Sequence, residues 1–79
     1  MKDEDSGHND ASTLLQLGLR CTVGHTVPVD LVAAHKWFNV AAMLGNAEAT
    51  RLRHEIAAQM SCAEVTAAQR AARAWMTKH

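Results

Sequence analysis

The sequence predicts an all-α fold of four helices, and three observations lead to that prediction. Apolar residues recur at helical spacing in four segments, capping residues precede these segments, and alanine supplies much of the apolar content. The apolar fraction is 48%, yet only Trp37, Phe38 and Trp75 are aromatic, and this mixture favours close helix packing over a thick sheet core. We expect helices near residues 11–22, 30–44, 46–59 and 62–77.

The first expected helix follows an acidic segment. Residues 1–10 contain one lysine, four acidic residues and no apolar periodicity, so we expect a disordered acidic tail there. We expect residues 11–79 to form a single repeat-like helical domain. Its first helix is rich in leucine, has Asp10 or Ser12 as its N-cap, and ends near Gly24.

The second helix is expected between two cap signals. Asp30 follows Pro28 at the spacing of an N-cap, and Gly45 readily adopts the left-handed conformation that ends a helix. Its apolar residues follow helical spacing on two faces, which are Leu31, Ala34, Phe38 and Ala41 on one, and Ala33, Trp37, Val40 and Leu44 on the other. A helix that is apolar on two sides is expected to pack between neighbours.

The third and fourth helices have cap signals and one apolar stripe each. Asn46 can cap the third helix directly after Gly45, and Ser61 with Glu64 forms a capping box at the start of the fourth. The stripes are Ala49, Leu52, Ile56 and Met60 in the third helix, and Val65, Ala68, Ala72 and Trp75 in the fourth. The stripe in the fourth helix either closes the core of one chain or meets a second chain.

Residues 17–49 carry a recognisable repeat pattern, which usually reads LGxxYxxGxGVxxDxxxAxxWxxxAAxxGxxxA. The matching residues are Leu17, Gly18, Gly24, Val27, Asp30, Ala34, Trp37, Ala41, Ala42, Gly45 and Ala49. This segment resembles the Sel-one-like repeat, a tetratricopeptide-like helical hairpin family, although Cys21 and Thr26 depart from the pattern. The resemblance implies one clear repeat unit at 13–49, capping helices at 46–79, and similarity to small stand-alone bacterial proteins.

The repeat motif has a physical interpretation. Gly18, Ala41 and Ala42 are small, and we expect them to let two helices approach closely, with Trp37 filling the space that they leave. Such a motif specifies a hairpin that needs neighbours and specifies no reaction.

The sequence gives no pattern typical of an enzyme, a metal site or a cofactor site. The five histidines do not pair at i, i+3 or i, i+4, which leaves His35 with Cys21 as a weak metal option. Cys62, in the first turn of the fourth helix, is either a reactive thiol or an incidental one. The chain has no apolar run that could span a membrane, an acidic start where a secretory signal would be basic, and no disulfide-rich pattern. We therefore expect a cytoplasmic location, no membrane and no cofactor.

These observations predict a non-catalytic protein–protein interaction module, either an adaptor or an inhibitor that occupies a partner's surface. Its partner would be an unidentified protein or peptide, and one clear repeat unit with an uncovered apolar face also predicts a two-fold homodimer. The candidate partner-binding residues are Phe38, Leu44, Ile56, Met60, Trp75, Arg70 and Arg73.

The alternative hypothesis is a nucleic-acid-associated accessory protein. It rests on a basic face made by Arg51, Arg53, Arg70, Arg73 and Lys78. The formal net charge is zero, and neither a recognition helix nor a stripe of stacking aromatic residues accompanies these cations, so nucleic acid is the less expected partner.

Overall fold

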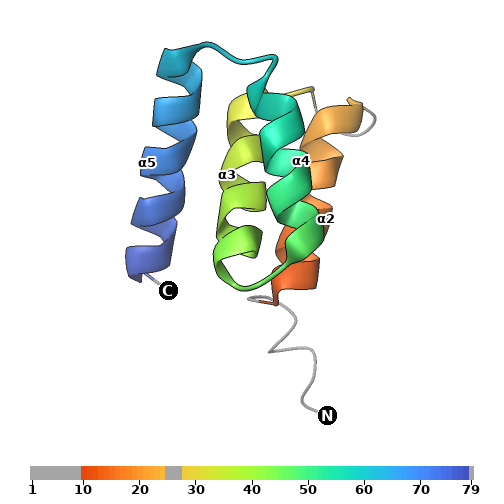
Figure 1. The fold of residues 1–79 in the computed structure, drawn as a ribbon, viewed down its shortest axis with the longest axis vertical. Helices are drawn as coiled ribbons and strands as arrows, with labels where there is room; N and C mark the ends of the chain where they lie inside the picture. The colour runs from red at the N-terminus through yellow and green to blue at the C-terminus, as the bar shows by residue number, and fades with distance from the viewer. Residues whose placement is uncertain (1–9, 25–27, 79) are drawn as a thin grey trace.

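Four α-helices follow one another along the chain, and consecutive helices are antiparallel (Figure 1). The computed structural model describes residues 10–24 and 28–78, and these residues contain no β-strand. The helices are α2 (Ala11–Val23), α3 (Leu31–Met43), α4 (Ala47–Ala57) and α5 (Cys62–Lys78). The predicted all-α fold of four helices is confirmed, whereas the expected disordered tail lies, apart from Asp10, outside the described residues.

The helices begin where the capping residues indicate. Asp10, Asp30 and Asn46 accept hydrogen bonds from the backbone N–H groups of Ser12, Ala33 and Ala49 at 3.3, 3.0 and 2.8 Å. In the capping box before α5, the Glu64 N–H donates to Ser61 Oγ at 3.1 Å, and the Ser61 N–H donates to Glu64 Oε1 at 2.8 Å. Each cap satisfies backbone donors that the helix itself leaves free, so these local interactions set the helix starts.

The helix ends depart slightly from the expected ones. Gly24 ends α2 in the left-handed conformation with a φ of 66°, and Gly45 follows α3 with a φ of 100°. Helix α4 stops at Ala57, two residues before the expected end, and the chain turns through hydrogen bonds from the N–H groups of Gln59 and Met60 to the carbonyl oxygens of Ile56 and Ala57. These turns lead directly into α5.

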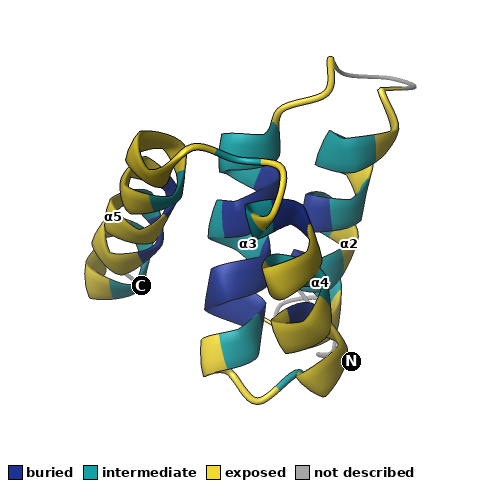
Figure 2. Ribbon diagram, turned by 45° about the horizontal axis from the view of Figure 1, so that its top comes forward, coloured by how far each residue is buried: buried dark blue, intermediate teal, exposed yellow. Residues whose placement is uncertain are grey.

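Helix α3 lies at the centre of the fold and packs against each of the other three helices. Figure 2 shows that much of the buried surface follows this helix, while α4 and α5 are exposed on their outer sides. The core consists of Leu14, Ala34, Phe38, Val40, Ala41, Ala49, Ile56, Ala68 and Ala72. The prediction that the second helix packs between neighbours is therefore confirmed.

The close approach of α2 and α3 depends on Gly18 and Phe38. A Cβ atom placed on Gly18 would lie 2.5 Å from Phe38 Cε1, so the phenylalanine ring occupies the space that the glycine leaves. The expectation that Trp37 fills this space is wrong, because Trp37 is only half-buried and packs edge-on against Trp75. Adjacent residues of a helix differ by about 100° in direction, so only one of the two rings can face α2.

Candidate functional site

A pocket of about 250 Å³ lies between α3 and α5. Lys36 from α3 lines it, together with Ala71, Ala74, Trp75 and Lys78 from α5. The four α5 residues are spaced i, i+3, i+4 and i+7 and therefore share one face of that helix. The lining combines apolar side chains with two lysines, which is a suitable combination for gripping an amphipathic side chain or segment.

Trp37 supports the pocket from α3. Its ring packs edge-to-face against Trp75, with 5.8 Å between the ring centroids and an interplanar angle of 82°. The Lys36 ammonium lies 4.0 Å from the centroid of the Trp37 ring, which is a cation–π contact. One aromatic side chain thus holds both a wall of the pocket and one of its two cations in place.

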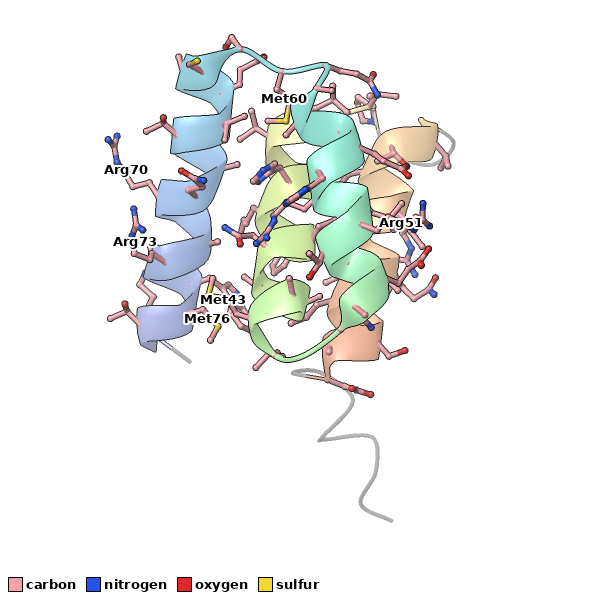
Figure 3. The ribbon with its side chains drawn as sticks, in the orientation of Figure 1. Met43, Arg51, Met60, Arg70, Arg73 and Met76 are labelled. Atoms are coloured by element: carbon pink, nitrogen blue, oxygen red, sulfur yellow. The ribbon has the colours of Figure 1, made fainter. Side chains whose placement is uncertain are left out.

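Exposed apolar residues gather where α3 ends. Met43 is 48% exposed and Leu44 is 43% exposed, which is high for residues of this size. Figure 3 shows that Met43 and Met76 point toward each other from the ends of α3 and α5. The exposed Met43 provides an adaptable apolar surface, because the methionine side chain is flexible and polarisable.

The candidate partner-binding residues predicted from the sequence fall into buried and exposed ones in the structure. Phe38 is 0% exposed and Ile56 is 7% exposed, so both belong to the core and offer no surface to a partner. Leu44 is exposed, and Met60 and Trp75 are half-buried. Of the seven candidates, which also include Arg70 and Arg73, Trp75 alone lines the pocket.

The cations of the predicted basic face do not all lie on one side of the molecule. Figure 3 shows Arg51 pointing to the opposite side of the molecule from Arg70 and Arg73, which project outward from α5. Arg51 forms ion pairs with Glu48 and Glu55, its neighbours along α4. Arg51 therefore does not belong to the same face as Arg70 and Arg73, because these cations lie on two helices that present different sides to solvent.

A polar group is buried between α3 and α4. Arg53 Nη1 donates to Asn39 Oδ1 at 2.7 Å, and the amide of Asn39 is almost wholly buried. His35 is 2% exposed, and its Nδ1 has no hydrogen-bond partner among the described residues. Burial lowers the pKa of His35, and the charges of Arg53 and His54 lower it further, so the folded chain favours the neutral imidazole.

The remaining chemical groups are dispersed. Burial raises the pKa of the Cys21 thiol, and the nearby Asp30 carboxylate raises it further. Cys62 is exposed, and both cysteines are free thiols. Within 10–24 and 28–78, no three His, Cys, Asp or Glu side chains are grouped as a metal site would require.

Comparisons with known proteins give no assignment. No family model matches the chain, and neither the curated proteins nor the solved structures contain a match. In the described part of the chain, none of the helices combines the length and apolar character needed to cross a membrane. The resemblance to the Sel-one-like repeat therefore stays a prediction.

Sequence reasoning missed most of the pocket. Ala71, Ala74 and Lys78 extend the spacing of Trp75 along one face of the fourth helix, and this stripe is visible in the sequence. Lys36 belongs to another helix far away in the chain, so no local spacing connects it to Lys78. Only the packing of α5 on α3 brings them to one pocket.

Proposed function

We propose that the chain is a non-catalytic protein-binding module, an adaptor or an inhibitor that occupies a partner's surface. The observation that carries this proposal is the pocket between α3 and α5, with the half-buried Trp75 in its lining. Tryptophan is enriched among the residues that dominate binding energy at protein interfaces. A volume of about 250 Å³ lies below the roughly 300–1,000 Å³ typical of small-molecule sites, so it suits one or two side chains of a partner.

The exposed end of α3 supports the same proposal. Met43 and Leu44 present apolar surface to solvent, and Met43 faces Met76, the neighbour of Trp75 on α5. A partner that inserts a side chain into the pocket could cover these residues as well. Contiguous exposed apolar surface is typical of interaction sites.

We also propose that the chain is a bacterial cytoplasmic protein of the Sel-one-like repeat family. The support for this proposal is the antiparallel pair α2 and α3, which approach closely at Gly18, with two further helices packed on α3. The free thiols of Cys21 and Cys62 fit a reducing compartment.

A second copy of this chain is one candidate partner. Leu44 and Trp75 both retain exposed surface, and both are among the candidate partner-binding residues. Light scattering behind a sizing column tests it, since a dimer has twice the mass of the 8.6 kDa chain. A mass near 8.6 kDa at high protein concentration would exclude the dimer and leave other proteins as partners.

Affinity capture with matched variants tests the module itself. Ala74→Glu places a charged side chain in the pocket at an exposed helical position. Thr66→Glu adds the same charge at an exposed position of α5 outside the pocket. We expect a set of proteins that the native chain and Thr66→Glu retain, that Ala74→Glu loses, and that nuclease treatment does not release. Identical sets for all three chains, or release by nuclease, would contradict the proposal.

A further inference from the structure

We propose that the pocket between α3 and α5 recognises an acidic peptide segment in which an apolar side chain lies next to carboxylates. This inference rests on the proposed protein-binding function and specifies the chemistry of the partner. The apolar part of the lining, made by Ala71, Ala74 and Trp75, would receive the apolar side chain. The two lysines of the pocket would form ion pairs with the carboxylates next to that apolar side chain.

The lysines of the pocket carry charges that the described residues do not balance with an ion pair. Among the residues that the structure describes, neither Lys36 nor Lys78 has an ion-pair partner. No acidic residue lines the pocket. The contact with Trp37 holds the Lys36 ammonium in position without neutralising it. The pocket therefore presents net positive charge over an apolar lining.

The carboxylates of the described residues are already engaged elsewhere. Asp10, Asp30 and Glu64 accept backbone N–H groups at helix starts, and Glu48 and Glu55 pair with Arg51. None of these groups can leave its site without loss of a helix cap or an ion pair. The described carboxylates therefore supply no negative charge to the pocket, and an acidic segment of another molecule would complement it.

A peptide fits this site better than a nucleic acid does. Proteins that bind single-stranded nucleic acid without sequence preference use a basic groove that follows the backbone over several nucleotides, together with aromatic stacking surfaces. Here two cations flank one small apolar pocket, while Arg70 and Arg73 point outward from α5 (Figure 3). A phosphodiester backbone would leave the alanine and tryptophan lining without an apolar partner.

Selection from a displayed library of random 12-residue peptides tests this proposal with the full chain. We expect the recovered peptides to contain Asp or Glu beside a leucine or an aromatic residue more often than the unselected library does. A synthetic copy of a recovered peptide should bind Lys36→Gln/Lys78→Gln about 2- to 30-fold more weakly than the native chain, because two exposed ion pairs are lost. Arg70→Gln/Arg73→Gln removes the same charge from the outward side of α5 and should weaken binding less, because only the screened long-range attraction is lost.

The possible outcomes separate this inference from the proposed function. Peptides that lose binding to Ala74→Glu but show no acidic excess would overturn the acidic partner and leave the protein-binding module intact. Recovery of no peptide sensitive to Ala74→Glu would overturn both. A fluorescent single-stranded DNA that binds the native chain and is lost in Lys36→Gln/Lys78→Gln would assign the lysines to phosphate and overturn the peptide.

Two other occupants of the pocket are tested by a mass measurement and by a further variant. A native mass of twice 8.6 kDa that Ala74→Glu returns to 8.6 kDa would show that a second copy fills the pocket, which overturns the proposal. Full-length chain with Asp3→Asn, Glu4→Gln and Asp5→Asn tests the chain's own acidic segment. Acidic peptides recovered only with this variant would identify that segment as the occupant and overturn a separate partner, whereas equal recovery with the native chain supports the proposal.

Discussion

Replacing Gly18 by alanine should destabilise the protein, although the same change stabilises most helices. In a helix interior, alanine is favoured over glycine by about 1 kcal/mol. At this position the new Cβ would lie 2.5 and 2.6 Å from Cε1 and Cδ1 of Phe38, which is closer than real Cβ contacts. Phe38 is wholly buried, so its ring cannot move into solvent to relieve the overlap.

The magnitude follows from these two opposing effects. Overpacking a core usually costs about 1–3 kcal/mol, and the short distances place this case in the upper part of that range. After the gain in helix propensity, we expect a net loss of about 1–2 kcal/mol in the free energy of unfolding. For a small domain, each kcal/mol lowers the melting temperature by about 4–8 °C.

Urea unfolding followed by circular dichroism at 222 nm measures this effect. Phe38→Leu supplies the matched background, because the smaller side chain makes room for a methyl group on Gly18. In that background we expect Gly18→Ala to be neutral or stabilising, so the two changes should be strongly coupled. If Gly18→Ala alone stabilises the native chain by about 1 kcal/mol, the close contact between α2 and α3 does not exist as described.

Other predictions concern the core, a buried histidine and a helix cap. Phe38→Ala should cost about 3–5 kcal/mol and Trp37→Ala less, because only Phe38 is wholly buried; comparable losses in thermal melts would contradict this order. Stability should fall as the pH drops below about 6.5, because the lowered pKa of His35 lets the unfolded chain bind a proton that the folded chain rejects. His35→Gln should flatten this dependence in urea titrations between pH 7 and 5, and an unchanged slope would assign it to other groups. Ser61→Ala should lower the free energy of unfolding by about 1 kcal/mol, because the hydrogen bond from the Glu64 N–H is lost. Faster hydrogen exchange of the amides in the first turn of α5 would show that the loss is local.

The sequence predicted the helices well because their ends depend on local contacts. The side chains of Asp30 and Asn46 reach backbone groups three residues later in the chain, so spacing alone identifies the caps. The ion pairs of Arg51 with Glu48 and Glu55 are also at i, i+3 and i, i+4 spacing, and the sequence could have excluded Arg51 from a basic face.

Packing direction was harder to predict. Trp37 and Phe38 are both apolar and adjacent, and helical periodicity places each on an apolar face without stating which face meets α2. The pocket also depends on how helices pack, since Lys36 and Lys78 line one pocket only because α5 packs on α3. Such contacts between distant segments leave no spacing in the sequence.

The central position of α3 has a consequence for how the molecule opens. Helix α5 docks chiefly on α3, and the residues that it buries completely are the alanines Ala68 and Ala72, which remove little apolar area from water. Backbone amides of α5 should therefore exchange with solvent deuterium through undocking of that single helix, while amides of α3 should wait for global unfolding. The pocket would vanish in each such opening event, so a bound partner should slow exchange in α5 far more than in α2.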